Sequence, residues 1–152
     1  GIFIVDDISP LQQWDATVWE TPVRLFEPRT AVVYQSALRQ IADLSGNRRF
    51  TAENPPTGAR VWYYVNGDLA RDMKLQLTIR DLKGTALESI ELPNKPGLNF
   101  HNLTILGEGA GGRGGRGGGA QPRGLRPGTY ILELTTADGI QRAPLTIEVV
   151  AP

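Results

Sequence analysis

Polar and apolar residues alternate along much of the second half of the chain. The segment from Lys74 to Asp81 alternates with a period of two, which is typical of a strand with one buried face. We therefore expect Leu75, Leu77 and Ile79 to face a core. Similar strand-forming segments are predicted at residues 59–65, 86–92, 98–106, 130–134 and 143–150. Turn pairs separate the segments at Asn66-Gly67, Lys83-Gly84, Pro96-Gly97 and Asp138-Gly139.

This spacing of strands and turns predicts the fold class. Six or seven short strands within about 100 residues, with a turn every 8–12 residues, are typical of an antiparallel sandwich of immunoglobulin size. We expect an all-β protein in which residues 50–152 form an immunoglobulin-like or fibronectin III-like β-sandwich, preceded by an extended N-terminal segment. The 18 glycines and 11 prolines argue against a helical bundle, because both residues weaken helix interiors.

The first 49 residues are patterned less clearly. Short β-rich pieces are interrupted by Pro22 and Pro28. The segment from Ala31 to Ala42 partly fits a helical stripe, so a short helix is predicted there. The chain opens on the apolar run Ile2–Val5, as if a strand were already under way. We therefore expect a further N-terminal part to precede this chain.

A glycine-rich segment lies inside the predicted sandwich. Nine of the thirteen residues from Gly107 to Gly119 are glycine, and such a stretch buries too little apolar surface to offset the entropy of ordering it. We expect residues 107–124 to form a disordered loop between two strands. Arg113 and Arg116 resemble the arginine–glycine segments that fold onto RNA, but no aromatic residue lies between them. A flexible linker is the preferred interpretation.

Composition narrows the range of functions. The 16 basic and 16 acidic side chains cancel, so the chain lacks the charge expected of a general binder of nucleic acids or acidic membranes. It has no cysteine, which excludes a disulfide framework, a thiolate metal site and a cysteine nucleophile. Its apolar runs are far shorter than the ~20 residues that span a bilayer. We predict no nucleic-acid partner and no membrane span.

Few residues could carry chemistry. Asp6 and Asp7 are adjacent, but neighbours on a strand point to opposite faces, so a strand end or turn is the preferred interpretation. His101 is the only histidine, which excludes a two-histidine metal site within the chain. The glycines at 107–112 are not followed by the helix that a dinucleotide site needs. We predict no catalytic residue, no metal site and no cofactor.

An aromatic cluster is the best candidate for an interaction site. In the strand predicted at 59–65, alternation places Trp62 and Tyr64 on one face and Tyr63 on the other. One face is expected to pack the core, and the other could stack on a sugar ring or on a neighbouring domain. We select Trp19, Trp62 and Tyr64 as ligand or interface candidates, and prefer a core plus domain interface to a carbohydrate site.

Short motifs in order along the chain resemble one bacterial family. The opening sequence from Gly1 to Leu11 resembles the stretch that closes the β-propeller of bacterial sortilin-like proteins, also described as glycosyl hydrolases with neuraminidase-type (BNR) repeats. Further similar pieces are Phe-x-Pro-Arg at 26–29, Asn-Pro-Pro-x-Gly-Ala at 54–59, Tyr-Tyr at 63–64, Asp-x-x-Gly at 81–84, Gly-Leu-Asn at 97–99, Pro-Gly-Thr-Tyr at 127–130 and Pro-Leu-Thr-x-x-Val at 144–149. The second half is also similar to the Ig-like domain of flagellar hook-capping proteins. Leu103-Thr104 stands where the family usually has Trp-Asp.

The resemblance implies an accessory role. Residues 1–49 would be the end of a propeller and its linker, and residues 50–152 the C-terminal domain of a larger bacterial protein that is extracellular or periplasmic. Its partners would be that upstream propeller and a glycan or cell-surface protein. A glycosidase centre needs paired carboxylates, and the family's fold would place it on the propeller. This chain itself is therefore expected to be non-catalytic, even where the parent protein is a glycosyl hydrolase.

Three alternatives stay open. The first is a carbohydrate-binding module that uses exposed aromatic rings, which an exposed coplanar pair would support and full burial would exclude. The second is a glycoside hydrolase, acting through this chain or through an active site outside it. The third is nucleic-acid binding through Arg113 and Arg116, which deletion of residues 107–124 would test.

Overall fold

The computed structural model describes residues 7–34, 58–105 and 124–150. Within these ranges the protein is all-β, as the sequence predicts, and helix is confined to two short turns. Most of the predicted loop at 107–124 lies outside the described residues, as do Ile2–Val5 and Asp6. The elements in chain order are α1 (Ser9–Gln12), the 3-10 helix η1 (Ala16–Trp19), β1 (Val23–Leu25), β2 (Ala31–Tyr34), β3 (Ala59–Val65), β4 (Leu75–Arg80), β5 (Ala86–Leu92), β6 (Gly97–Leu103), β7 (Gly128–Thr136) and β8 (Gly139–Val150).

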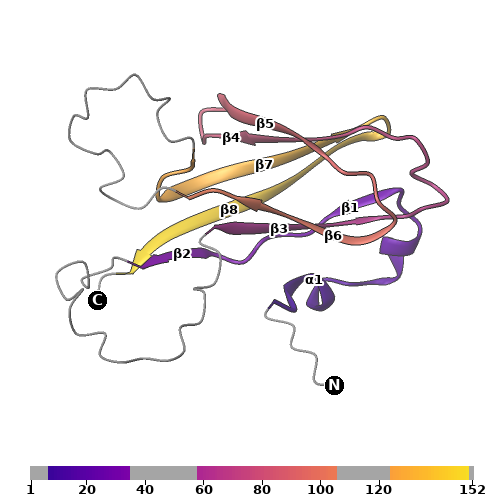
Figure 1. Ribbon diagram of the computed structural model, residues 1–152, viewed down its shortest axis with the longest axis horizontal. Coiled ribbons are helices and arrows are strands. Elements are labelled where there is room, and N and C mark those ends of the chain that lie inside the picture. Colours follow the sequence, from indigo (N-terminus) through magenta and orange to yellow (C-terminus); the bar gives the residue numbers. More distant parts are fainter. Residues whose placement is uncertain (1–6, 35–57, 106–123, 151–152) are drawn as a thin grey trace, which may run out of the picture.

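The strands form two sheets (Figure 1). One sheet has three strands in the order β1-β3-β6, and the other has five strands in the order β2-β8-β7-β4-β5 and curls into a half-barrel. Neighbouring strands are antiparallel except β2 and β8, which run parallel, so the expectation of a purely antiparallel arrangement is wrong for this pair. Strands β1 and β2, assigned to the linker from the sequence, each belong to one of the two sheets. The division at residue 49 stays a prediction.

Strand β2 also corrects the helix predicted from Ala31 to Ala42. Its described residues, Ala31–Tyr34, are a strand that pairs with Ile147–Val150 of β8. The adjacent Val32 and Val33 are β-branched and fit a strand better than a helix. Pairing with β8 therefore outweighs the weak helical spacing, and the rest of the predicted helix lies outside the described residues.

A core of mostly aliphatic side chains fills the space between the two sheets. Leu75, Leu77 and Ile79 are buried there, which confirms the alternation predicted for β4. Tyr63 enters the same core from β3, and its hydroxyl donates a hydrogen bond to the Pro93 carbonyl at 3.0 Å. Burial raises the pKa of Tyr63. The core therefore joins the sheets by apolar contact and by one directed polar contact.

Two of the predicted turns make different connections, one within a sheet and one between the two sheets. The Asp138-Gly139 pair forms a β-hairpin between β7 and β8, in which Thr136 pairs with Gly139 and the glycine has a positive φ of 145°. The Asn66-Gly67 pair also forms a turn, since the Ala70 N–H donates to the Asn66 carbonyl at 2.8 Å. This second turn carries the chain from β3 to β4, which belong to different sheets.

Gln141 joins the two sheets at the outer edge of β1. Its side-chain Oε1 accepts a hydrogen bond from the Leu25 N–H at 2.9 Å, and its Nε2 donates to the Val23 carbonyl at 2.6 Å. The amide of this β8 residue therefore takes the place of one peptide group of a neighbouring strand. Both backbone groups would otherwise be left unpaired at that edge.

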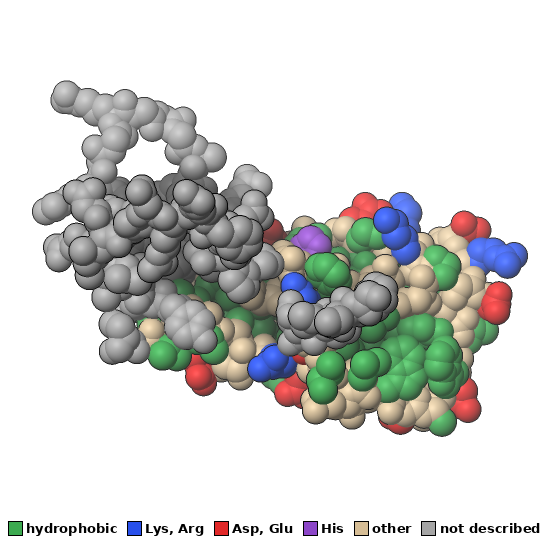
Figure 2. All heavy atoms as spheres, turned by 60° about the horizontal axis from the view of Figure 1, so that its bottom comes forward, with side chains coloured by type: hydrophobic (Ala, Val, Ile, Leu, Met, Phe, Trp, Pro, Cys, Tyr) green, Lys and Arg blue, Asp and Glu red, His purple; other side chains and the backbone are tan. Residues whose placement is uncertain are grey.

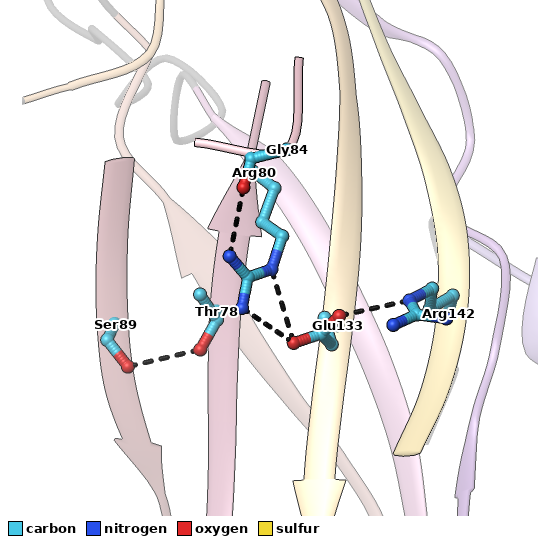
Figure 3. A network of polar contacts seen from close by, with 6 residues as sticks. All are labelled: Thr78, Arg80, Gly84, Ser89, Glu133 and Arg142. Atoms are coloured by element: carbon cyan, nitrogen blue, oxygen red, sulfur yellow. Dashed lines mark hydrogen bonds and ion pairs between the residues drawn. The ribbon is translucent and has the colours of Figure 1, made fainter. Parts of the chain in front are cut away.

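Glu133 is the centre of a polar network on the outer face of the five-stranded sheet (Figure 3). Its carboxylate lies between Arg80 and Arg142, with N–O distances of 3.0 Å on each side. Arg80 also donates to the Gly84 carbonyl at 3.0 Å. The two arginine side chains cover the carboxylate, so Glu133 is buried although it faces outward. Hydrogen bonds from Arg80 and then Arg142 hold the pKa of Glu133 below its ordinary value.

This lowered pKa makes part of the stability pH-dependent. The network should contribute fully above the ordinary glutamate pKa, and its contribution should be lost as the pH falls through the lower folded-state pKa. The stability difference between the wild type and Glu133→Gln should therefore shrink as urea titrations are moved from pH 7 into the acid range. A difference that stays constant with pH would contradict this assignment.

Candidate interaction surface

The segment before β1 lies along the outer face of the three-stranded sheet (Figure 1). Gln13 fixes its path because its side chain exchanges two hydrogen bonds with the backbone of Glu27, each of 2.8 Å. Asp15 caps η1 by accepting from the Thr17 N–H at 2.8 Å. The hydrogen bonds from the Thr17 hydroxyl and N–H hold the pKa of Asp15 below its ordinary value. These contacts position the tryptophans on either side of the cap.

Four aromatic side chains form a cluster that we call the aromatic layer: Trp14, Trp19, Phe26 and Tyr64. Trp14 is in the middle, with ring centroids 5.2 Å from Trp19, 5.7 Å from Phe26 and 5.0 Å from Tyr64. Trp19 also meets Tyr64 at 5.6 Å. Phe26 and Tyr64 are buried with Val18 in a second, smaller core. Trp19 therefore rests on a packed aromatic base that holds its ring in place.

Arg60, Trp62 and Phe100 form a second aromatic group on the same sheet. Trp62 and Phe100 are paired across β3 and β6, with ring centroids 5.1 Å apart. The Arg60 guanidinium carbon lies 4.7 Å from the Phe100 centroid and 5.8 Å from the Trp62 centroid, within the range of a cation–π contact. Arg60 also donates a long hydrogen bond, 3.4 Å, to Asn102. It takes part in no ion pair among the described residues.

Asp7 connects the start of the described chain to the group of Arg60, Trp62 and Phe100 by a hydrogen bond. Its carboxylate accepts from the Trp62 indole N–H at 2.9 Å and from the Ser9 N–H at 3.0 Å. Burial by itself would raise the pKa of Asp7, but the hydrogen bonds from Ser9 and Trp62 outweigh it and lower that pKa. The adjacent Asp6 lies outside the described residues. Asp7 therefore orients an aromatic ring and the start of α1, which agrees with the turn interpretation of this position.

Much of this face is apolar and open to solvent. Trp19 is 58% exposed and Phe100 is 49% exposed, and Ile8, which precedes α1, and Leu11, on α1, are exposed as well. Figure 2 shows hydrophobic side chains gathered into a broad area on the face that comes forward from the bottom of Figure 1. Exposed apolar areas of this kind mark interaction sites in soluble proteins more often than isolated exposed residues do.

The ring geometry limits what this face can bind. Trp14 and Phe26 are stacked at 22°, but Phe26 is buried. The other aromatic pairs on this face are tilted by 59° to 79°. The described residues therefore offer no exposed coplanar pair, and they hold no group of three or more potential metal ligands. The tilted rings make this apolar surface uneven. Such a surface is better suited to contact with a folded protein than to stacking on the flat face of a sugar ring.

The sequence candidates all lie on this face, although with different exposure. Trp19 and Tyr64 are in direct contact, while Trp62 is half-buried and pairs with Phe100. Whether they contact a ligand or partner stays a prediction. Sequence reasoning missed Trp14, Phe26, Arg60 and Phe100. Their association depends on strand register and on the path of the N-terminal segment, which no local pattern indicates. Only the period-two alternation around Phe100 could have shown that this ring faces outward.

Comparisons with known proteins add no relative. The chain matches no family model, no curated protein and no solved structure. Within the described ranges, the helices are all too short or too polar to cross a membrane.

Proposed function

We propose that this chain is a non-catalytic docking domain whose aromatic layer packs against another folded protein surface. The observation that carries the proposal is the exposed Trp19 ring, supported from below by buried Tyr64 and Phe26. Tryptophan, tyrosine and arginine dominate the binding energy of protein interfaces. A ring already held in place also loses little conformational freedom on binding.

The fold proposed for this domain is an immunoglobulin-like or fibronectin III-like sandwich. Two sheets around a common core and the β7–β8 hairpin support it. Following the sequence resemblance, the partner is the upstream propeller of a larger extracellular or periplasmic bacterial protein. Any glycosidase centre would then lie outside this chain.

A carbohydrate-binding module is the second candidate, favoured by the same exposure of Trp19. Sugar-binding platforms present flat aromatic faces, and the tilted rings of the aromatic layer argue against one. The domain could also bind a glycan or a cell-surface protein. This is compatible with the docking proposal only if Trp19 still contacts the partner domain.

Trp19→Ala, made in this chain and in the longer protein that contains it, tests the proposal. In the chain alone it should lower the free energy of unfolding by about 1 kcal/mol, because the ring is largely exposed but packs edge-on against Trp14 and Tyr64. In the longer protein the contact with the partner domain should weaken by at least ~1 kcal/mol, as at an energetically important interface residue. Calorimetric unfolding of both proteins measures the difference.

Leu87→Ala is the matched control, because Leu87 is exposed on β5 in the other sheet. It should leave both proteins unchanged. The docking proposal would be overturned if Trp19→Ala cost no more stability in the longer protein than in the chain alone. Glycan-array binding by the chain alone that Trp19→Ala abolishes would favour the carbohydrate-binding module instead.

A further inference from the structure

The described sheets have four edge strands, and three of their edges are protected. Gln141 hydrogen-bonds to the outer edge of β1. Strand β5 carries the exposed Glu88 and Glu91, and charged edge residues discourage pairing with another chain. Strand β2 is short, with four residues. Strand β6 is different, since its seven residues include no proline and no lysine, arginine, aspartate or glutamate.

The hydrogen bonds of the neighbouring strands show which backbone groups of β6 are free. The Phe26 N–H donates to the Trp62 carbonyl, so Trp62 directs its backbone groups toward β1. Because these groups alternate along a strand, Val61 and Tyr63 direct theirs toward β6. Their register partners on β6 are His101 and Asn99.

The remaining positions of β6 therefore point away from β3. Leu98, Phe100 and Asn102 each present one N–H and one C=O along the outer edge, and no described strand pairs with them there. Immediately beyond the strand, the Leu125 N–H donates to the Thr104 carbonyl at 2.9 Å. The protein thus hydrogen-bonds an extended segment of its own just past β6 and leaves the edge from Leu98 to Asn102 open within the described ranges.

The side chains around this edge indicate what a new strand would need. On the outer face, the Arg60 guanidinium lies over the Phe100 ring and has no carboxylate partner among the described residues. On the inner face, β6 presents the half-buried Asn99 and His101, and in the other sheet Ile90 of β5 is partly buried and packs against the core. A strand beside β6 would bring its outward side chains next to Phe100 and Arg60, and its inward side chains toward the rim of the core.

We propose that β6 binds an extended segment of a partner protein by strand addition, with a glutamate or aspartate of that segment facing Arg60. The backbone groups of Leu98, Phe100 and Asn102 supply the affinity, and the pairing of the carboxylate with Arg60 supplies the specificity. Alternation places every second side chain of the segment on the inward side, toward the rim of the core. This site is separate from the contact made by Trp19, so either proposal can fail without the other.

A capped seven-residue peptide, Val-Thr-Val-Glu-Val-Thr-Val, is the probe, and its glutamine version is the control. In NMR titrations of the full chain, the glutamate peptide should shift the amide signals of Leu98, Phe100 and Asn102 and slow their hydrogen exchange. Replacing the glutamate by glutamine should weaken binding on the order of fivefold, as expected for loss of one partly exposed ion pair. Phe100→Pro should abolish binding, because it removes an outward N–H that β3 does not use.

Arg60→Gln is a second variant that tests the proposal even if the Phe100→Pro protein does not fold. It should lower the affinity for the glutamate peptide to that of the glutamine peptide and leave the latter unchanged. Leu87→Lys, on the edge strand β5, should change neither affinity. The proposal would be overturned by amide shifts confined to other edges, by no saturable binding, or by equal effects of Arg60→Gln on both peptides. A dimer of this chain that Phe100→Pro dissociates would also overturn it, because the occupant would then be a second copy.

Discussion

Phe26→Ala is expected to lower the free energy of unfolding by about 3–5 kcal/mol, the range typical of removing a buried phenylalanine. Phe26 is 1% exposed and stacks on Trp14 at 5.7 Å, so the truncation leaves a cavity beneath the aromatic layer. Trp14 would lose its stacking partner, and Trp19 would lose the support that Trp14 provides. Urea unfolding gives the loss of stability, and a red shift of the tryptophan emission would report the loosened layer.

Phe100→Ala is the matched control, because it removes the same atoms from a ring that is half exposed. Its expected cost is about 1 kcal/mol, the order of one aromatic pair contact with Trp62. Equal losses for the two variants would mean that the layer is not a packed second core. The docking surface would then lack its preorganised base.

Gln141→Ala is expected to lower the free energy of unfolding by about 2 kcal/mol, because it leaves the Leu25 N–H and the Val23 carbonyl without their shared partner. Both groups belong to β1, which precedes Phe26 and orients it. Hydrogen exchange at the Leu25 amide should therefore accelerate more than exchange in the β7–β8 hairpin. Urea unfolding and amide exchange measure these two effects.

Gln76→Ala provides the comparison, since Gln76 is an exposed glutamine on β4. A surface substitution of this kind usually changes stability by less than about 0.5 kcal/mol. If both variants lost the same small amount, the two hydrogen bonds of Gln141 would not be what closes the edge of β1.

A strand could be predicted from sequence where its pattern is local, and could not where its conformation depends on a partner far away in the chain. Strand β4 was predicted correctly because burial of Leu75, Leu77 and Ile79 imposes a local period of two. Strand β2 was not, because its strand conformation depends on parallel pairing with β8, which lies more than a hundred residues away in the chain. The Asn66-Gly67 turn was predicted, but its connection between two sheets depends on long-range packing.

The interaction surface was predictable only in part for the same reason. Alternation placed Trp62 and Tyr64 on one face, as the structure has them. It gave no indication that Trp14 packs against Trp19, Phe26 and Tyr64, because the hydrogen bonds of Gln13 to Glu27 set the path of the N-terminal segment. Likewise, the Gln141 contact joins residues whose association no local pattern indicates.

If Trp19 contacts another domain, its ring is shielded from solvent there, so the solvent accessibility of Trp19 tests the contact most directly. In the double variant Trp14→Phe, Trp62→Phe, Trp19 is the single remaining tryptophan of the chain. Acrylamide should quench its fluorescence readily in the chain alone and several-fold less in a longer protein whose other tryptophans are also replaced. Equal quenching in the two proteins, or protection that appears only when a sugar is added, would contradict the proposed docking function.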